Sequence, residues 1–326
     1  MGNRNMGKYK MSEEERRYLD SYDITQFDRP SVVADMAVFS IMGKGGGNEK
    51  KQVRDRDNYR KLPEKTLKIL LIKRGTYPYK DCWALPGGFC QSKETVYETA
   101  RRELYEETHV KNAYLNPCGI YGEPDRDPRG WIISHTFLAL IDGEKCELRA
   151  GTDAWEARWF DISFIKKEKK KIVGKDGVVI DNEYLLQLTN SDIGVTNLRD
   201  CVDKEVCLSA EISEHREFKD YHETVEYRVV RSKGFAFDHA KIITCAVLDL
   251  RKRAEEDGKI VFDMMPELFT LTQLQRAFET ILDKKLLVAN FRRKMADYVV
   301  ETKQIVEGAG HRPAKLFKRN LDTFYK

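Results

Sequence analysis

The 326-residue sequence predicts an α/β protein of the α+β kind with two domains. A mixed β-sheet flanked by helices comes first, and a small domain of helices and a hairpin follows. Three observations support this prediction: apolar runs of strand length, a capped amphipathic helix that interrupts them, and two short helices ahead of a hairpin near the C-terminus. With 41% apolar and 34% charged residues, the composition suits a globular protein with a highly charged surface.

Composition also argues against several classes of protein. No apolar run approaches the roughly 20 residues that a helix needs to cross a bilayer. The segment Met1–Glu15 is polar and lacks the apolar stretch of a signal peptide. The seven cysteines include no Cys-x-x-Cys pair, which argues against a zinc site or a disulfide framework. We therefore expect a cytoplasmic protein that does not contact membranes.

The first domain is expected at residues 31–165, after an N-terminal extension at residues 1–30 with a short charged helix near Ser12–Leu19. It should carry a charged, glycine-rich loop insertion at residues 43–66. Five apolar runs are typical of its strands. They lie at Ser31–Met42, Leu67–Lys73, Leu115–Tyr121, Ile132–Asp142 and Ala154–Phe160.

A β-rich insertion is predicted at residues 166–234, beyond what such a domain needs. A lysine-rich run opens it, and Asp176-Gly177 between apolar runs predicts a hairpin. Nothing in the sequence assigns this insertion a function. The C-terminal domain is then expected at residues 235–326, and its first helix can be capped by Asp238.

One helix of the first domain has clear signals. Thr95 is a suitable N-cap, and Glu98 three residues later completes a capping box. Val96, Ala100 and Leu104 recur every four residues and form a face that packs on a core. The sequence therefore predicts an amphipathic helix with one side buried.

Three carboxylates lie beside that buried side. Glu103, Glu106 and Glu107 are three and four residues apart, so they are neighbours on a helix. Like charges this close repel unless a cation lies between them, and Mg²⁺ takes oxygen ligands and bridges to substrate phosphates. The three carboxylates would border a cleft beside the core, and Glu94, just before the cap, can reach that cleft. We expect these four glutamates to hold Mg²⁺, with Mn²⁺ as an alternative.

These residues resemble the Nudix box, the signature of a hydrolase superfamily. The matching positions, at the correct spacing, are Gly88, Glu94, Arg102, Glu103, Leu104, Glu106, Glu107 and Val110. One position departs, because His109 stands where the box has glycine, at a helix end that often needs positive φ. The resemblance implies an α/β/α sandwich and metal-dependent hydrolysis of nucleoside diphosphates linked to another group.

The same resemblance implies a set of site residues. The candidate catalytic residues are Glu103, Glu106, Glu107 and Arg102, and the candidate substrate-binding residues are Gly87, Gly88, Arg126 and Arg129. Arg102 is expected to orient the glutamates through an ion pair. The two other arginines lie in an Asp/Pro-rich loop that suits phosphate or ribose, although a purely structural turn is the alternative. The general base stays open between Glu103 and a distant carboxylate such as Glu156.

The C-terminal domain has the plan of a winged helix-turn-helix. A capped amphipathic helix at Phe269–Leu282 precedes a basic helix at Val288–Met295, and strand-like runs at Tyr298–Ile305 and Ala314–Lys318 suggest a hairpin. From Lys284 onward there are 11 Lys and Arg against 4 Asp and Glu, which favours a polyanionic partner. The side chains expected to contact double-stranded DNA are Asn290, Arg292, Arg293, Lys294 and Arg312. A dimerisation brace with a basic surface is the alternative.

Almost the whole chain resembles Nudix-related transcriptional regulators, which join a Nudix domain to a winged helix. The similar segments are Trp83–Phe89, Gly122–Gly130, Phe235–Ala240, Asn290–Lys294 and His311–Ala314, while residues 166–234 lie outside the usual pattern. The resemblance implies that the first domain senses ADP-ribose or related sugars and that the protein forms a homodimer.

Two functions stay open at this point. The first is a Mg²⁺-dependent pyrophosphohydrolase, with ADP-ribose as the favoured substrate. The second is an ADP-ribose- or sugar-responsive transcriptional regulator with weak or no hydrolysis. The intact acidic residues favour the first function, and the basic helix favours the second.

Overall fold

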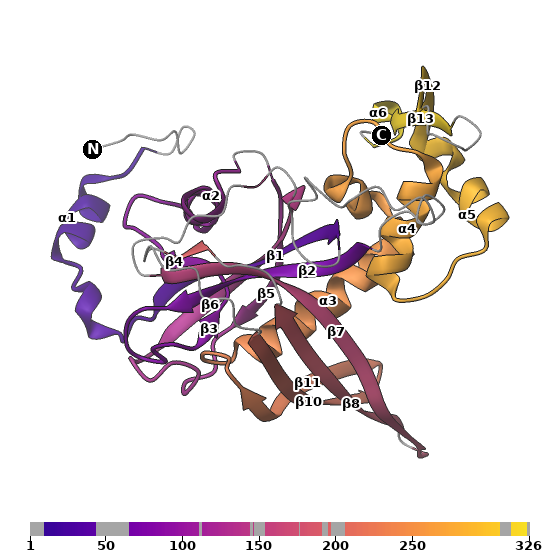
Figure 1. The fold of residues 1–326 in the computed structure, drawn as a ribbon. Coiled ribbons are helices and arrows are strands. Elements are labelled where there is room, and N and C mark those ends of the chain that lie inside the picture. Colours follow the sequence, from indigo (N-terminus) through magenta and orange to yellow (C-terminus); the bar gives the residue numbers. More distant parts are fainter. Residues whose placement is uncertain are drawn as a thin grey trace.

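The fold was analysed in a computed structural model, which describes residues 10–43, 65–110, 113–143, 146, 154–175, 177–190, 195–196, 206–306 and 314–324. A mixed sheet has a helix on each face, and a smaller helical domain with a two-stranded hairpin follows it (Figure 1). The predicted fold class is therefore confirmed. The loop insertion predicted at residues 43–66 lies outside the described residues, apart from its ends.

The large sheet places its main strands in the order β11-β10-β8-β7-β2-β1-β6-β5. Only β1 and β6 run parallel among the described pairs, and the other pairs are antiparallel. The bounds of these strands are β1 Ser31–Gly43, β2 Lys65–Arg74, β5 Tyr114–Tyr121, β6 Ile132–Leu140, β7 Ala154–Val173, β8 Gly177–Asn190, β10 Val206–Lys219 and β11 His222–Lys233. Three short strands pair beside them: β3 Trp83–Ala84, β4 Gly87–Phe89 and β9 Val195–Thr196.

The central strand β1 is buried on both faces. Met36 and Val38 pack in the cluster under helix α2 (Val96–Thr108), whereas Ala37 and Phe39 pack in the cluster under helix α3 (His239–Glu256). Successive side chains of a strand point to opposite faces. Both faces are covered by helices, so this strand appears in the sequence as a continuous apolar run rather than an alternating one.

The segment predicted as a β-rich insertion continues the same sheet. Strand β7 runs on to Val173, and β8, β10 and β11 add to its edge. Val173 pairs with Val178 across the turn, so the hairpin predicted at Asp176-Gly177 is confirmed, although Asp176 itself is outside the described residues. Inward side chains from the added strands, including Leu186 and Ile212, pack into the cluster under α3.

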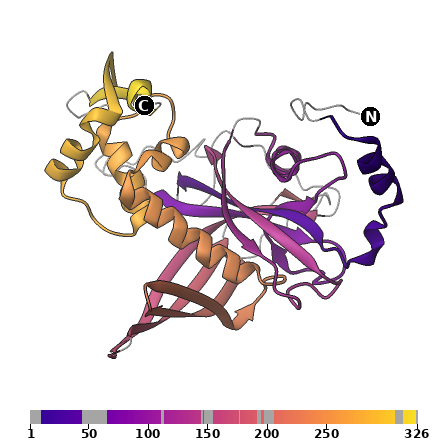
Figure 2. The same ribbon diagram turned by 180° about the vertical axis from the view of Figure 1, so that it is seen from behind.

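Helix α3 crosses one face of the sheet and reaches the C-terminal domain (Figure 2). Its apolar face belongs to the same core cluster as side chains of the sheet and of helix α4 (Leu271–Leu282). The sequence analysis placed this helix at the start of the C-terminal domain. In the structure it forms the outer layer of the sheet, so one continuous core connects both parts of the chain.

The C-terminal domain shows the predicted order of helix, turn, basic helix and hairpin. Thr270 caps α4 through a capping box with Gln273. The Phe269 and Phe317 main chains exchange hydrogen bonds, which attach the hairpin to the start of α4. The remaining elements are the 3₁₀ helix η3 Lys259–Met264, helix α5 Val288–Met295, the 3₁₀ helix η4 Ala296–Tyr298, strands β12 Val299–Val306 and β13 Ala314–Arg319, and helix α6 Leu321–Phe324.

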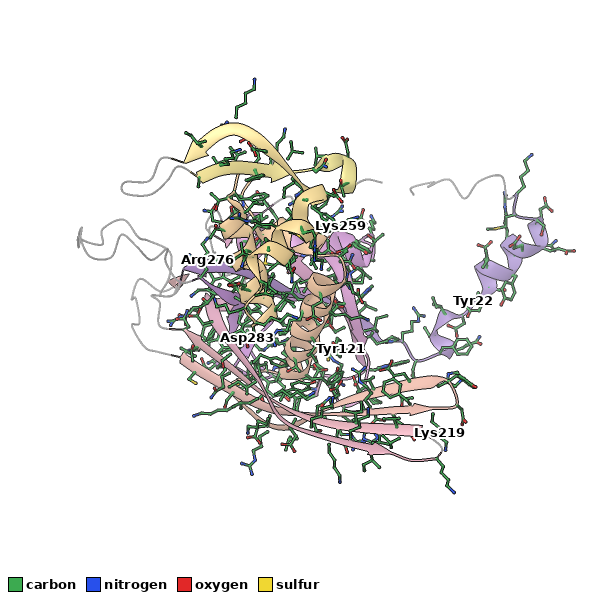
Figure 3. All side chains as sticks on the ribbon, turned by 90° about the vertical axis from the view of Figure 1, so that its right-hand side faces the viewer. Tyr22, Tyr121, Lys219, Lys259, Arg276 and Asp283 are labelled. Carbon is green, nitrogen blue, oxygen red and sulfur yellow. The ribbon has the colours of Figure 1, made fainter. Side chains whose placement is uncertain are left out.

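The N-terminal extension forms helix α1 (Glu13–Ser21), capped by Ser12, and a 3₁₀ turn η1 (Ile24–Gln26). Neither element has a buried residue. Figure 3 shows Tyr22 on this arm, apart from the body of the molecule. None of the helices in the described ranges has the length and apolar character needed to span a bilayer.

A buried carboxylate joins β10 to its neighbours. Glu214 accepts hydrogen bonds from Tyr184 Oη at 2.8 Å, Tyr227 Oη at 3.0 Å, Arg216 Nη2 at 2.7 Å and the Asn182 amide. Burial opposes ionisation of this carboxyl, but the hydrogen bonds outweigh it and lower the pKa to about 2. The ionised form of Glu214 therefore helps to hold three adjacent strands together.

We expect Glu214→Gln to lower the free energy of unfolding by about 3 kcal/mol at pH 7. Because folding lowers this pKa from 4.5 to about 2, the stabilisation is present above about pH 4.5 and is lost as the pH falls toward 2. Urea denaturation of the wild type and the variant between pH 7 and pH 2.5 measures this difference. Glu217→Gln, farther along the same strand, is the matched control, and equal stability of the wild type and Glu214→Gln at pH 7 would contradict the prediction.

Candidate functional site

The acidic helix α2 has the predicted local structure. Thr95 and Glu98 form the predicted capping box, and Ala100 and Leu104 are buried against the sheet. The helix ends at His109, which adopts φ 57° and ψ 11° and donates its backbone N–H to the Tyr105 carbonyl. The predicted positive φ at this position is thus confirmed. Histidine tolerates this region better than most residues, so the helix end forms without glycine.

The glycine turn packs directly against the acidic helix. Gly88 lies in β4, which pairs with β1, and a Cβ at this position would collide with the Glu103 carboxylate. A side chain on Gly87 would meet the backbone of Ala34 and Asp35. Both glycines are therefore needed where strand β1, the turn and the Glu103 side chain approach one another.

Arg102 brings together one carboxylate from the loop before the helix and two from the helix itself. Its guanidinium donates to Glu94 Oε1 and Oε2 at 2.8 and 3.1 Å and to Glu103 Oε1 at 2.7 Å, and it lies 3.6 Å from Glu106 Oε1. Bidentate pairing of this kind fixes geometry as well as charge. The arrangement agrees with an orienting role for Arg102.

The carboxylates have different environments. Burial raises the pKa of Glu103, and the nearby negative charges of Glu106 and Glu94 add to the rise, while Arg102 opposes it. The hydrogen bonds from Arg102 lower the pKa of Glu94. Glu107 is buried, and Glu106 is about half exposed. A cation at this position would favour the ionised form of Glu103, which burial and, to a smaller extent, the neighbouring carboxylates disfavour.

A divalent cation fits the donor set, although the described side chains include no group of three His, Cys, Asp or Glu residues already placed around an ion. Glu103, Glu106 and Glu107 supply oxygen ligands at helical spacings of three and four residues. Arg102 pairs with Glu103 and approaches Glu106 in this arrangement. The carboxylate oxygens suit a hard cation. For the cation to bind, Arg102 would have to share the oxygens of Glu103 and Glu106 with it or release them.

The two candidate substrate-binding arginines have different positions. Arg126 is buried and donates to both carboxylate oxygens of Asp238, at 3.1 and 2.8 Å. Arg129 is held by Asp127, stays partly exposed, and lies over the rings of Phe89 and Phe237 at 5.2 and 5.4 Å from their centres. Of these two arginines, Arg129 is therefore the one that presents a guanidinium beside the glycine turn.

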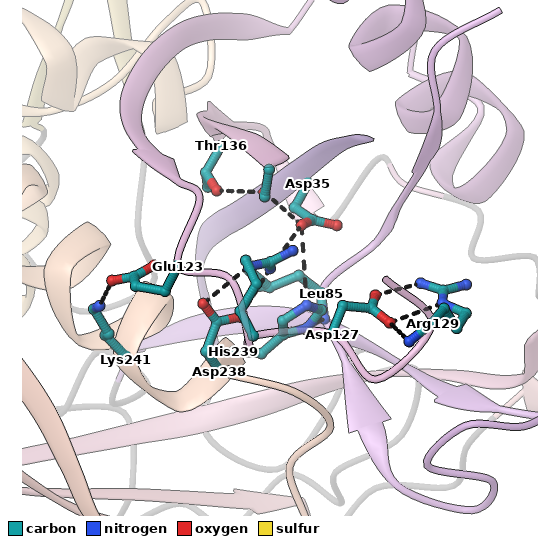
Figure 4. A network of polar contacts seen from close by, with 11 residues as sticks. Asp35, Leu85, Glu123, Asp127, Arg129, Thr136, Asp238, His239 and Lys241 are labelled. Carbon is teal, nitrogen blue, oxygen red and sulfur yellow. Dashed lines mark hydrogen bonds and ion pairs between the residues drawn. The ribbon is translucent and has the colours of Figure 1, made fainter. Parts of the chain in front are cut away.

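A network of polar side chains joins this site to α3 (Figure 4). His239 Nδ1 accepts the backbone N–H of Leu85 at 2.9 Å, in the segment just before the glycine turn. Burial lowers the pKa of His239, which keeps the ring neutral and able to accept. Lys241 pairs with Glu123 in the loop that carries Arg126 and Arg129.

Asp35 lies at the centre of this network. Its carboxylate accepts from Ser134 Oγ at 2.5 Å and lies 3.9 Å from the Arg126 guanidinium and 4.0 Å from His239 Nε2. The sequence analysis did not identify this residue, because an Asp inside an apolar strand has no spacing signal. It expected Asp238 to cap α3 with its side chain, which is wrong, since Arg126 occupies both oxygens.

The structure separates Glu156 from the acidic helix. Its carboxylate pairs with Arg158 on β7. Side chains alternate along this strand, and Phe160 packs in the cluster under α3, so Glu156 points to the face opposite α2. Of the two carboxylates considered as general base, only Glu103 lies beside the glycine turn.

The basic residues of α5 form an exposed surface. Asn290, Arg292, Arg293 and Lys294 are exposed, whereas Phe291 and Met295 are buried. The Lys294 ammonium donates to the backbone carbonyl of Glu255 near the end of α3. Arg312 lies outside the described residues.

Comparison with protein families identifies two domains. A model of the NUDIX domain matches residues 61–181, and a model of the NrtR DNA-binding winged helix domain matches residues 261–318. The sequence is 49% identical over 104 residues to an ADP-ribose pyrophosphatase of Methanocaldococcus jannaschii, a match that spans 32% of this chain and 60% of that protein. It is 26% identical over 313 residues to the ADPR responsive transcriptional repressor NtrR of Acinetobacter baylyi, covering 95% of this chain and 90% of the relative.

Solved structures show a similar fold. A MutT/nudix family protein from Enterococcus faecalis superposes with a TM-score of 0.56 at 21% identity, covering 96% of this chain and all of that one. Shewanella oneidensis NrtR complexed with a 27mer DNA superposes with a TM-score of 0.53 at 21% identity, covering 90% and 94% of the two chains. The chain thus combines a NUDIX domain with an NrtR-type winged helix domain, and it is homologous to the ADP-ribose-responsive repressor and to ADP-ribose pyrophosphatase.

Proposed function

We propose that the NUDIX domain hydrolyses the diphosphate of ADP-ribose with a divalent cation, Mg²⁺ or Mn²⁺. The observation that carries this proposal is the position of the Glu103 carboxylate, which lies against Gly88 with Glu106 and Glu107 on the same helix. The 49% identity to an ADP-ribose pyrophosphatase supports the choice of substrate.

The roles follow from the positions of the side chains. Glu103, Glu106 and Glu107 hold the cation, and Glu94 is tied by Arg102 at the edge of the same group. When bound, the cation neutralises the diphosphate and lowers the pKa of the attacking water. Glu103 is our candidate for the general base, because its carboxylate lies directly against Gly88 at the glycine turn.

Arg129 is our candidate for binding the substrate. Its guanidinium is fixed by Asp127 and lies over the exposed ring of Phe89, directly after the glycine turn. An arginine held in this way can offer planar hydrogen bonds to a phosphate or a ribose. Arg126, bound to Asp238 in the interior, instead stabilises the junction with α3.

A second function is favoured by a separate observation. The helix α5 exposes Asn290, Arg292 and Arg293 and follows α4 across a short turn, the geometry of a recognition helix. The match to a DNA-binding winged helix domain and the full-length similarity to an ADP-ribose-responsive repressor support DNA binding by this chain. We propose that ADP-ribose in the NUDIX domain changes the affinity of the protein for DNA.

We expect Glu106→Gln to reduce ADP-ribose hydrolysis at least about 100-fold in the presence of Mg²⁺, because the cation loses a charged ligand. Release of AMP and ribose 5-phosphate from ADP-ribose, measured by chromatography, tests this expectation. Glu98→Gln, on the same helix but in the capping box, is the control that leaves the metal ligands intact. Absence of turnover by the wild type with Mg²⁺ or Mn²⁺ would refute hydrolysis of ADP-ribose.

The two arginines of the 122–130 loop should behave differently. Arg126→Ala removes the buried member of the pair with the partly exposed Asp238 and should lower the free energy of unfolding by about 2 kcal/mol. Arg129→Ala removes a partner of the buried Asp127 carboxylate, so it should also lower stability, but it should in addition raise the KM for ADP-ribose about tenfold. Thermal denaturation and steady-state kinetics of both variants measure these effects, and a raised KM in Arg126→Ala but not in Arg129→Ala would show that Arg126 binds the substrate.

DNA binding should depend on the exposed face of α5. The double variant Arg292→Ala with Arg293→Ala should weaken binding to DNA upstream of the chain's own gene at least about 100-fold. Fluorescence anisotropy at several salt concentrations measures this loss, and Lys252→Ala on the exposed side of α3 is the control. Wild-type protein that shows no salt-sensitive DNA binding would exclude the regulatory function.

A further inference from the structure

Strand β7 carries a row of lysines on the α3 face of the sheet. Tyr184 of β8 packs in the core cluster under α3, and Lys166 lies opposite it, with the ammonium 5.8 Å from the ring centre. Lys169 and Lys171 lie opposite the next two side chains on that face of β8, and directly opposite residues share a face. All three lysines are exposed. We call them the inner lysine row.

The charges of the inner lysine row are not compensated by carboxylates. In the described part of the chain, none of its ammonium groups forms an ion pair. Glu214, on the same face, already accepts hydrogen bonds from four other groups. Burial lowers the pKa of Lys166, and the positive charges of Lys169 and Arg216 lower it further, against the attraction of Glu214. The row is therefore a group of mutually repelling cations that an anion would stabilise.

The lysines on the outer face of the same strand have different surroundings. Lys167 donates to Glu211 at 2.8 Å, and Lys170 lies opposite Asp181 of β8. A carboxylate thus accompanies each of these two lysines. The uncompensated positive charge of β7 lies on the α3 face.

The inner lysine row starts beside the turn of the helix-turn-helix. Arg251 of α3 lies 5.3 Å from the centre of the Phe164 ring on β7 and 3.6 Å from the Asp283 carboxylate, at the turn between α4 and α5. Lys166 is two residues beyond Phe164, and at about 3.3 Å per residue Lys171 is at most about 23 Å beyond it. Figures 1 and 2 show the far end of β7 on the same side of the molecule as α5.

We propose that the inner lysine row binds the phosphate backbone of duplex DNA, next to the segment that α5 contacts. This contact depends on the DNA binding proposed for the winged helix domain, and it gives the β7–β8 extension a part in that binding. Phosphate contacts of this kind position a protein on DNA without reading its sequence. Each DNA strand has one phosphate per roughly 3.4 Å, so a row that ends about 23 Å beyond the turn reaches about seven base pairs past α5.

Duplex DNA fits this surface better than a single-stranded nucleic acid does. Single-strand sites combine cations with exposed aromatic rings on which bases stack. The ring beside this row belongs to Tyr184, which is 6% exposed and donates its hydroxyl to Glu214. The row therefore offers positive charge without a stacking surface, which suits the outward-facing phosphates of a duplex.

Fluorescence anisotropy of the full chain with a long duplex from upstream of its own gene tests this contact. Lys169→Gln with Lys171→Gln removes two charges from the inner row. It should weaken binding about tenfold and reduce the slope of log Kd against log salt concentration by about two, because each lost phosphate contact removes roughly 0.9. Lys167→Gln with Lys170→Gln removes two charges from the outer face of the same strand. This matched control should change neither quantity.

Shortening the duplex from both ends gives a second readout. Once the flanks no longer reach the row, the inner double variant and the wild type should bind with the same Kd. Arg292→Ala with Arg293→Ala should instead weaken binding to the long and the short duplex alike, because α5 contacts both.

The outcomes separate this contact from DNA binding itself. Equal Kd and slope for the wild type and the inner double variant on the long duplex would overturn the contact, while DNA binding that needs Arg292 and Arg293 would stand. Equal losses in the inner and outer variants would reduce the effect to net charge and would also overturn it. Tighter binding to a single strand of the same length, lost in the inner variant alone, would assign the row to single-stranded nucleic acid instead. A wild type that binds no DNA would remove both functions.

Discussion

The packing of α3 on the sheet is the constraint on which the rest of the structure depends. The first turn of this helix holds two loops of the NUDIX domain, through the Arg126–Asp238 ion pair and the Leu85–His239 hydrogen bond. Its far end packs on α4, and the Arg251 guanidinium donates to the backbone carbonyl of Ile281 there. One rigid element therefore contacts both the segment before the glycine turn and the winged helix domain.

This arrangement gives the proposed regulation a physical route. A ligand changes DNA affinity only if it binds one arrangement of the protein more tightly than another. Arg129 and the glycine turn, which we propose to face the ligand, lie within a few residues of the groups that hold α3. A ligand that repositions this loop would therefore act on the helix through buried, directional contacts, which tolerate small displacements poorly.

Local features of the fold and site were predictable from the sequence. The capping box at Thr95, the spacing of the three glutamates, and the positive φ at His109 each follow from residues within one or two helical turns. Contacts between distant segments were not predictable in this way. Arg126 and Asp238 are 112 residues apart, and the cap expected from Asp238 was replaced by this stronger ion pair. The hairpin of β7 and β8 was predicted from Asp176-Gly177, but the addition of β10 and β11 to its edge depends on pairing that no local pattern encodes.

We infer that occupancy of the NUDIX domain is transmitted through α3 to the winged helix domain. The most direct measurement is the Kd for upstream DNA, obtained by fluorescence anisotropy with and without a saturating methylene-bridged analogue of ADP-ribose that resists hydrolysis. We predict that the analogue changes the Kd for DNA about fivefold or more. An identical Kd in both conditions, with analogue binding verified by calorimetry, would contradict it.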